Sequence, residues 1–423
     1  MKNKCENLRL LIVGPYPPPY GGIASHLVTL IPSIHNRGAS DIAIVSFGDR
    51  DDVVKLEGAT LYRFNTQHHI KKIMSRQGMR FLIASIKTLK SGKFGFRKIL
   101  GEAVRAFLIN QVAELHASNV VSFYQSDSSL SLLPCMDQWN NSRGVVLMIL
   151  GEIYDSPDSF ITRKKFYEHY MASPHSVISS SKHCACSFKK ILGISRPVEH
   201  IYLGIDLERF STTQLRESYR AELGVEAETT LVLFMGRFNA QMGLDSLLEI
   251  GPELLARLPQ ITLLLCGAKG PLSAAAIVFA EQYPGRVHVI NDVPSEMQPA
   301  IYAASDIVLA PSHDQHACMG MSIKEAMAAS RPVIGTDSAG IPEAIVHNET
   351  GFLVPLDKHT KSVNLEELMR YIALLVSNVT LRESMGIAAR QRAETIFSMD
   401  RTNDRMGELF MTAMSISETK ISS

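Results

Sequence analysis

The chain has 423 residues, of which 46% are apolar, and its formal net charge at pH 7 is +1. This length predicts two or three domains with substantial cores, and the balanced charge gives no general attraction to nucleic acid. No apolar run approaches the roughly 20 residues of a membrane span, and the N-terminal residues lack the apolar core of a signal peptide. We therefore expect a cytoplasmic protein.

The cysteine content predicts neither a disulfide framework nor a metal centre. Six cysteines are too few for such a framework in a chain of this length. The cluster His183-Cys-Ala-Cys186 lacks the second cysteine pair of a typical structural zinc site. We expect no metal ion and no resident cofactor.

The first half of the chain alternates buried strands with helical patterns. Leu8–Val13 is followed by a Pro-rich loop that ends at Gly21-Gly22 and by a helix, which is the opening unit of a Rossmann-like domain. Further strands are predicted at Ile42–Phe47, Thr60–Phe64, Val120–Tyr124, Val145–Leu150 and Ser176–Ser180. Glu152 follows one of these strands directly, where a carboxylate can act as a base or bind an acceptor. The alternative is a solvated loop carboxylate.

Residues 70–105 form the segment with the most uneven charge. Met79, Ile83 and Ile86 belong to one apolar helical face, and basic side chains gather beside it. The ten basic residues, set against Glu102, are Lys71, Lys72, Arg76, Arg80, Lys87, Lys90, Lys93, Arg97, Lys98 and Arg105. Such a helix can lie on an anionic membrane, where each basic residue contributes about 1 kcal/mol. The alternative is an ordinary surface helix with its apolar face on the sheet.

The second half repeats the alternation after a polar stretch at 211–228. Strands are predicted at Leu231–Met235, Ile261–Cys266, Val287–Ile290, Ile307–Ala310 and from Val333. We place one domain at 1–215 and a second at 216–397, and expect a helix at about 398–415 to return to the first.

A loop and helix after Ile307–Ala310 suggest an anion site. The amides near Gly320, Met321 and Ser322 would lie at a helix N-terminus, which favours negative charge. Glu325, one turn further on, could accept hydrogen bonds from sugar or ribose hydroxyls. The alternative is a capping box, Ser322-Ile-Lys-Glu325, in which Glu325 satisfies the helix's own donors.

Several motifs in this region resemble, in order, the donor site of retaining GT-B glycosyltransferases of family 4. They are Ser305-Asp-Ile-Val-Leu-Ala-Pro-Ser312, Glu325-Ala-Met-Ala, Arg331-Pro-Val-Ile-Gly-Thr-Asp337, Gly340-Ile-Pro-Glu343 and Asn348-Glu-Thr-Gly351-Phe-Leu-Val-Pro355. The resemblance extends more weakly over nearly the whole chain. It implies an α/β protein with the GT-B fold, in which two Rossmann-like, doubly wound parallel-sheet domains face a cleft and the second holds a nucleotide-sugar.

The resemblance also implies roles for individual residues. Arg237, in Gly236-Arg237-Phe-Asn-Ala-Gln-Met-Gly243, would neutralise the donor diphosphate, and Glu152, Arg237 and Glu325 are the predicted catalytic residues. Gly21 and Gly22 would lie against the phosphates, since glycine lacks a Cβ, although a plain tight turn is the alternative. The full predicted donor-binding set is Gly21, Gly22, Gly236, Arg237, Lys269, Val293, Met319, Gly320, Met321, Ser322 and Glu325.

Three positions depart from the family pattern. Met242 stands where the family has a lysine, Ala317 where it has a glutamate, and Leu150 where it has a histidine. Lys269 is a candidate substitute for the missing cation, and His313 and His316 lie in the altered loop. Asp49-Arg-Asp51 resembles the metal-binding pattern of another glycosyltransferase fold, but we interpret it as an acidic loop.

We therefore expect transfer of a hexosyl group from a nucleotide-sugar to an acceptor hydroxyl with retention, in cell-surface glycan or glycolipid biosynthesis. The expected acceptor is a glycan or a lipid-linked precursor, and residues 70–105 are expected to contact an anionic membrane peripherally. The three departures favour a second hypothesis, a catalytically silent relative that binds nucleotide or glycan and supports a partner enzyme. A sugar-nucleotide epimerase of the same architecture fits the motifs less well.

Overall fold

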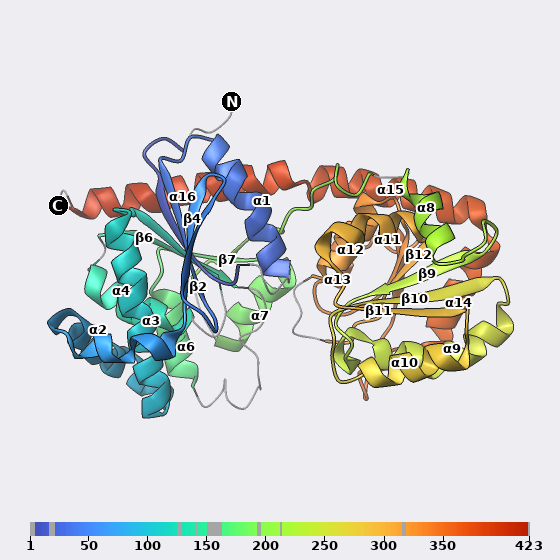
Figure 1. Ribbon diagram of the computed structural model, residues 1–423, viewed down its shortest axis with the longest axis horizontal. Helices are drawn as coiled ribbons and strands as arrows, with labels where there is room; N and C mark the ends of the chain where they lie inside the picture. Colours follow the sequence, from blue (N-terminus) through green and yellow to red (C-terminus); the bar gives the residue numbers. More distant parts are fainter. Residues whose placement is uncertain are drawn as a thin grey trace. The chain divides into compact units, whose positions relative to one another are not determined.

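The computed structural model forms two compact units, shown in Figure 1. The first comprises Met1–Leu203 with Asp400–Ser423, and the second comprises Gly204–Met399. The structure describes residues 5–16, 22–124, 129–140, 142–149, 163–192, 196–211, 214–314 and 319–421.

Among its described residues, the first unit is built on an eight-stranded sheet with the order β3-β4-β2-β1-β5-β6-β7-β8. All neighbouring strands are parallel except β3 and β4. The strands are β1 (Arg9–Val13), β2 (Asp41–Phe47), β3 (Asp52–Leu56), β4 (Ala59–Phe64), β5 (Val120–Tyr124), β6 (Gly144–Ile149), β7 (Ser176–Ser179) and β8 (Glu199–His200). The predicted strands are all present, whereas β3 is an addition that the acidic sequence around it obscured.

Helices cover the sheet of the first unit. They are α1 (Gly22–Asn36), α2 (Arg76–Leu89), α3 (Phe96–Leu115), α4 (Leu132–Trp139), α6 (Lys164–Ala172), α7 (Lys182–Leu192) and α16 (Met399–Ile421), with short 3₁₀ turns η1 (Thr66–Met74), η2 (Lys90–Gly92) and η3 (Ser129–Ser131). In Figure 1, α2 lies at the periphery of this unit.

The packing of α2 differs from the surface-helix alternative given above. It packs on α3 and α4, and α3 contacts β1 and β2, so α2 does not lay its apolar face on the sheet. Phe81, Ala84 and Leu89 are buried, but Ile83 is 61% exposed and Ile86 is also exposed. The apolar face that the sequence predicts is therefore divided between the helical layer and solvent.

The second unit is a doubly wound parallel sheet with the strand order β11-β10-β9-β12-β13-β14. The order reverses between β9 and β12, and open α/β sheets bind ligands beyond the carboxyl ends of the strands at such a point. The strands are β9 (Thr230–Met235), β10 (Ile261–Gly267), β11 (Val287–Asn291), β12 (Ile307–Ala310), β13 (Val333–Thr336) and β14 (Gly351–Val354).

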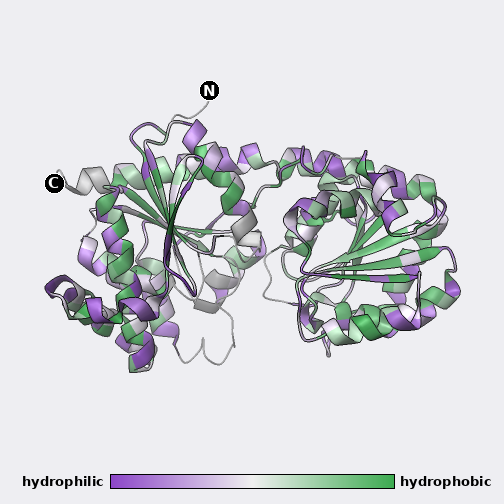
Figure 2. Cartoon of the chain, in the orientation of Figure 1, coloured by the Kyte–Doolittle hydropathy of each residue, from purple (hydrophilic) through white to green (hydrophobic). Residues whose placement is uncertain are grey.

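The helices of the second unit cover both faces of its sheet (Figure 1). They are α8 (Leu215–Glu222), α9 (Leu244–Arg257), α10 (Ser273–Gln282), α11 (Gln298–Ala304), α12 (Met321–Ala328), α13 (Ile341–Ala344), α14 (Leu365–Ser377) and α15 (Val379–Ile396), with η4 (Ala240–Met242) and η5 (Ser295–Met297). Figure 2 shows apolar strands in both units, with polar residues on the outer sides of many helices. Within the described residues no single helix is long and apolar enough to cross a membrane, and α14 with α15 meets that test as a pair bent by 103°.

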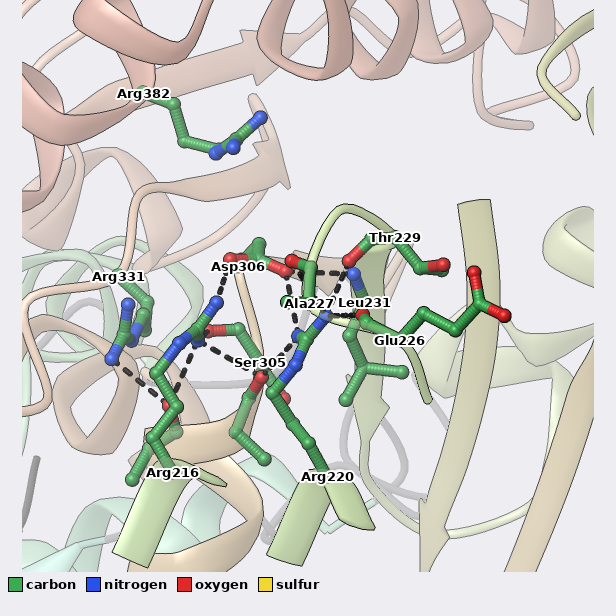
Figure 3. Close-up of polar contacts among 12 residues, drawn as sticks. Arg216, Arg220, Glu226, Ala227, Thr229, Leu231, Ser305, Asp306, Arg331 and Arg382 are labelled. Carbon is green, nitrogen blue, oxygen red and sulfur yellow. Dashed lines mark hydrogen bonds and ion pairs between the residues drawn. The ribbon is translucent and has the colours of Figure 1, made fainter. Parts of the chain in front are cut away.

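An arginine cluster anchors α8 at the amino-terminal edge of the second sheet (Figure 3). Asp306 directly precedes β12, is 7% exposed, and accepts from Arg216 (2.6 Å), Arg220 (3.2 Å) and the amide of Leu231 (2.8 Å). Both arginines also donate to the carbonyl of Ala304 (3.0 Å each). The polar residues of α8 thus belong to the second unit, and the predicted domain boundary at 215/216 falls inside that unit, whose first residue is Gly204.

Candidate active site

The loops after β9 and β12 lie together at the carboxyl edge of the second sheet, where the strand order reverses. The carbonyl of Gln241 accepts from Ser312 Oγ (2.8 Å) and from the amide of His313 (3.2 Å). Gly243 has φ of +80°, and a Cβ there would overlap Pro311. Glycine is therefore required where these two loops meet.

Arg237 is exposed at the end of β9, and its side chain makes no hydrogen bond or ion pair to the residues that the structure describes. The neighbouring backbone is fixed, because the amide of Phe238 donates to the carbonyl of Ala268 (3.0 Å) and Asn239 Oδ1 accepts from the amide of Met242 (2.9 Å). The guanidinium can thus form a two-pronged contact with a phosphate without giving up a protein partner.

The N-terminus of α12 lies in the loop after β12. Gly320 is the N-cap, with φ of −64°, and no described side chain caps the helix. The amides of Met321 and Ser322 therefore face outward from the positive end of the helix dipole. Because α12 begins at Met321, Ser322 is not the N-cap and the capping-box alternative for Glu325 does not hold. Met319 is half-buried just before this turn.

Glu325 is 8% exposed, and its Oε2 accepts from the Tyr302 hydroxyl at 2.7 Å. Burial raises the pKa of the Glu325 carboxyl, while the Tyr302 hydrogen bond and the positive charges of Arg209 and Lys324 lower it, leaving a net rise. Burial likewise lowers the pKa of Lys324 to about 7, although Glu325 opposes this. Sequence reasoning identified neither Tyr302 nor Arg209 as a neighbour of Glu325, because both are distant from it in the sequence.

Lys269 and Val293 follow β10 and β11 respectively. Gly267 has φ of +143°, and a Cβ there would overlap the carbonyl of Gly236, so the two loops are in close contact. The Lys269 ammonium lies 3.0 Å from Asp292 Oδ2, and its amide donates to Asp292 Oδ1 (3.1 Å). The charge of Lys269 is therefore already balanced by Asp292. Val293 is half-buried beside this pair.

Several predicted positions lie outside the described residues. These are Gly21, Leu150, Glu152, His316 and Ala317. Gly22 is the first residue of α1. The structure thus brings together Gly236, Arg237 and the α12 N-terminus at one edge of the second sheet, while the first-domain positions stay predictions.

Asp51, from the Asp49-Arg-Asp51 sequence, is hydrogen-bonded rather than open to a ligand. It contacts His68 Nδ1 (2.6 Å), His69 Nε2 (2.8 Å) and the amide of Asn65 (2.8 Å). Burial tends to raise the pKa of Asp51, but these hydrogen bonds outweigh it and hold the pKa at about 2. Among the described residues, no group of three or more His, Cys, Asp or Glu side chains is arranged to hold a metal ion.

The family model and the curated relatives report what the chain is similar to. Residues 216–392 match the family model described as Glycosyl transferases group 1. A D-inositol 3-phosphate glycosyltransferase from Corynebacterium diphtheriae is 32% identical over 203 residues, which are 45% of this chain and 45% of that protein. A GDP-mannose-dependent alpha-(1-6)-phosphatidylinositol monomannoside mannosyltransferase from Mycolicibacterium smegmatis is 25% identical over 237 residues, 54% and 60% of the two chains. The chain spans about half the length of the curated relatives it matches.

Solved structures match the whole fold. Sucrose-phosphate synthase from Thermosynechococcus elongatus gives a TM-score of 0.74 at 16% identity, covering 96% of this chain and 99% of that one. Anabaena Alr3699/HepE, in complex with UDP and glucose, gives 0.72 at 17% identity, covering 95% and 99%. These neighbours confirm the predicted GT-B fold with its two parallel-sheet α/β domains.

Proposed function

We propose that this protein is a glycosyltransferase that moves a sugar from a nucleotide-sugar to an acceptor hydroxyl with retention at the anomeric carbon. The observation that carries the proposal is the pair of anion-binding features at the carboxyl edge of the second sheet, where the strand order reverses. Arg237 is exposed and has no side-chain partner among the described residues, and no described side chain caps the N-terminus of α12. Residues 216–392, which include both, match the Glycosyl transferases group 1 family model. The activity in the names of the curated relatives supports the same reaction class.

The proposed chemistry rests on stabilising a leaving diphosphate. Negative charge accumulates on the diphosphate as the glycosidic bond breaks, and fixed donors aimed at that charge lower the barrier. Arg237 would donate two parallel hydrogen bonds, and the amides of Met321 and Ser322 would add the helix dipole. Glu325 would accept from ribose or sugar hydroxyls. The proposal assigns the charge stabilisation to these groups and requires no metal ion.

The test is a thermal-shift panel with UDP, GDP, ADP and their sugars on the parent, Arg237→Ala and Arg257→Ala. A ligand at 100 times its dissociation constant stabilises the protein by about 2.7 kcal/mol. We expect one base to stabilise the parent and the Arg257→Ala control, whose arginine is exposed on α9, and to lose its effect in Arg237→Ala. An absence of any shift in the parent would contradict the donor site.

The acceptor is proposed to be a glycan or lipid-linked precursor, with the enzyme cytoplasmic and peripheral at the inner face of an anionic membrane. The support lies in η1, α2 and the start of α3, which expose large apolar side chains between exposed basic ones. Met74 is 75%, Ile83 61% and Phe96 65% exposed. The exposed basic residues around them are Lys71, Lys72, Arg76, Arg80, Lys87, Lys90, Lys93 and Arg97. Such a surface suits an anionic membrane.

A catalytically silent relative is the second candidate, because Met242 removes one family cation. It would bind the nucleotide in the thermal-shift panel but release no nucleoside diphosphate from any nucleotide-sugar in the presence of membrane extracts. Turnover that the parent shows and Glu325→Ala lacks would eliminate this candidate.

A further inference from the structure

The second unit has a small cavity at the end of α12 that lies away from the proposed donor site. The cavity has a volume of about 130 Å³ and is lined by Arg331, by Arg390 and by residues at the ends of α11 and α12. The helix α12 begins at the donor site with Met321, and its last residue, Ala328, borders the cavity. A helix of eight residues is about 12 Å long, so the cavity and the donor site are separate.

Backbone carbonyls hold the two arginines of the cavity in place. Arg331 donates from Nη2 to the carbonyl of Ala303 (3.0 Å), and Arg390 donates from Nη1 to the carbonyl of Ala328 (2.6 Å). Nη1 of Arg331 and Nη2 of Arg390 are accessible to solvent and have no hydrogen-bond partner among the described residues. The guanidinium groups are therefore fixed by the protein, and each keeps N–H donors for a ligand.

The cavity is positively charged. Arg331 makes no ion pair with a described residue, and none of the described residues that line the cavity is acidic. Arg390 pairs with Glu394 (2.6 Å), whose side chain is 48% exposed. An exposed carboxylate of this kind is screened by water and compensates little of the charge.

The surroundings of Arg331 add to the positive charge. Figure 3 shows Arg331 beside a cluster in which Arg216 and Arg220 share the carboxylate of Asp306. Burial lowers the pKa of Arg331 to about 10, and the charges of Arg216, Arg220 and Arg382 lower it further while Asp306 opposes them. An anion next to Arg331 would compensate for this repulsion between cations.

We propose that this cavity binds a small oxyanion of the phosphate type, held by Arg331 and Arg390. Guanidinium groups bind phosphate oxygens through paired N–H donors. A protein cavity of about 150 Å³ holds a molecule of benzene, so a cavity of about 130 Å³ accepts orthophosphate or the phosphoryl group of a small ester. A nucleoside diphosphate is too large for it. The site is therefore additional to the proposed nucleotide-sugar site and does not depend on it.

The test is equilibrium dialysis with radiolabelled orthophosphate at constant pH and ionic strength, on the full chain carrying Arg237→Ala. That substitution removes the proposed diphosphate ligand, so the label reports on the cavity. In this background, Arg331→Gln removes cationic donors, and Ala329→Leu fills the cavity but keeps both arginines. Arg286→Gln is the matched control, because Arg286 also donates to a carbonyl at a helix end, that of Leu258 (3.0 Å), but does not line this cavity.

We expect the Arg237→Ala protein to bind one phosphate per chain. Arg331→Gln and Ala329→Leu should each weaken this binding at least about tenfold, whereas Arg286→Gln should leave it unchanged. Circular dichroism verifies that each variant is folded at the dialysis temperature. If Arg331→Gln does not fold, Ala329→Leu decides the question, since it leaves the arginines in place.

Competition identifies the source of the phosphate. Displacement of the label by glycerol 3-phosphate, but not by glycerol, would show that the cavity takes a phosphomonoester. Displacement by unlabelled orthophosphate alone would show that the free ion is the ligand. Either result supports the proposed site.

Two results would overturn the inference. The first is an absence of phosphate binding to the Arg237→Ala protein, and the second is phosphate binding that a folded Arg331→Gln or Ala329→Leu variant leaves unchanged. In both cases Arg331 and Arg390 serve only to hold the ends of α11 and α12. The proposed function would stand, because the nucleotide panel on the parent and Arg237→Ala tests it separately.

Discussion

The burial of Glu325, which we propose as a donor-binding residue, also affects the stability of the folded protein. Burial raises its pKa above the ordinary 4.5, although Tyr302, Arg209 and Lys324 each lower it in part. A raised folded-state pKa means that the folded protein holds the proton more tightly than the unfolded chain. The free energy of unfolding contributed by this group therefore falls as pH rises from about 4.5 through the raised value.

Replacing Glu325 with glutamine should separate the effect of this carboxylate on stability from its proposed effect on turnover. The amide oxygen can still accept from Tyr302, and the buried charge is gone, so Glu325→Gln should gain melting temperature relative to the parent as pH rises from 5 to 8. Turnover should fall by at least about tenfold, because the negative charge that strengthens the hydrogen bonds of this side chain to donor hydroxyls is lost. Calorimetric melts at several pH values with a product assay check this, and a variant less stable than the parent at pH 8 would contradict it.

The sequence predicts Glu325 as a site residue but not its surroundings. The Glu-Ala-Met-Ala motif identifies the position, whereas the hydrogen bond from Tyr302 joins residues 23 apart in sequence, one on α11 and the other on α12. Long-range partners of this kind leave no periodic signal in one sequence.

At the scale of elements, the arginine cluster explains why α8 belongs to the second unit. Arg216 and Arg220 both pair with Asp306 (Figure 3). Burial lowers the pKa of nearby Arg331 to about 10, and Arg216 adds to this lowering while Asp306 opposes it. The carboxylate of Asp306 therefore balances the charge of the buried Arg220 and of the partly exposed Arg216.

Asp306→Ala should lower the free energy of unfolding by about 3–5 kcal/mol, because it leaves the buried Arg220 and the partly exposed Arg216 without their counter-charge. Asp404→Ala provides a matched control. Asp404 also pairs with an arginine, at 2.8 Å, but its side chain is 52% exposed, so its loss should cost less than about 1 kcal/mol. Urea unfolding monitored by circular dichroism measures both, and equal losses would contradict the assignment.

The exposed basic side chains of α2 allow the proposed membrane binding to be tested. Arg76 and Arg80 are exposed, and neither makes an ion pair to a described residue. Replacing both by glutamine should weaken binding to anionic vesicles by about 2 kcal/mol, roughly 30-fold, at low salt. Sedimentation with phosphatidylglycerol-containing vesicles measures this, with pure phosphatidylcholine vesicles as the neutral comparison.

Controls separate the charge of this face from its apolar contribution. Lys358→Gln with Lys361→Gln removes two exposed charges from the second unit and should leave vesicle binding unchanged. Ile83→Ser should weaken binding at both low and high salt, since burial of apolar surface is not screened. Parent protein that fails to sediment with anionic vesicles at low salt would refute the membrane proposal.

At the scale of the whole molecule, strand periodicity predicts much of both sheets. The strands that the alternation indicates are present, because parallel strands buried on both faces read as continuous apolar runs. The short β3 escapes this reasoning, since its alternate residues are half-buried against β4. The boundary between the two units, at Leu203 and Gly204, could not be predicted from composition either. The polar composition of residues 211–228 is typical of a linker, whereas in the structure arginine side chains from this stretch bind the second unit.

The first unit is discontinuous in sequence, because residues 400–423 belong to it together with residues 1–203. Apart from Met399, α16 belongs to the first unit; its Met406 and Phe410 are fully buried, and Thr402 donates to the carbonyl of Tyr202 (2.7 Å). Deleting residues 400–423 should therefore expose the core of the first unit and leave the second intact. Phe410→Ala is a milder form of the same change and should cost about 3–5 kcal/mol.

Differential scanning calorimetry can assign these losses to a unit. We expect both variants to lower the midpoint temperature of one unfolding transition, that of the first unit. The nucleotide that stabilises the parent should still raise the midpoint temperature of the other transition by the same amount, because the proposed donor residues Arg237 and Glu325 lie in Gly204–Met399. Limited proteolysis of the deletion variant should then leave a resistant fragment that still binds nucleotide. A single transition that falls as a whole, with nucleotide binding lost, would instead mean that the second unit depends on α16 for its own stability.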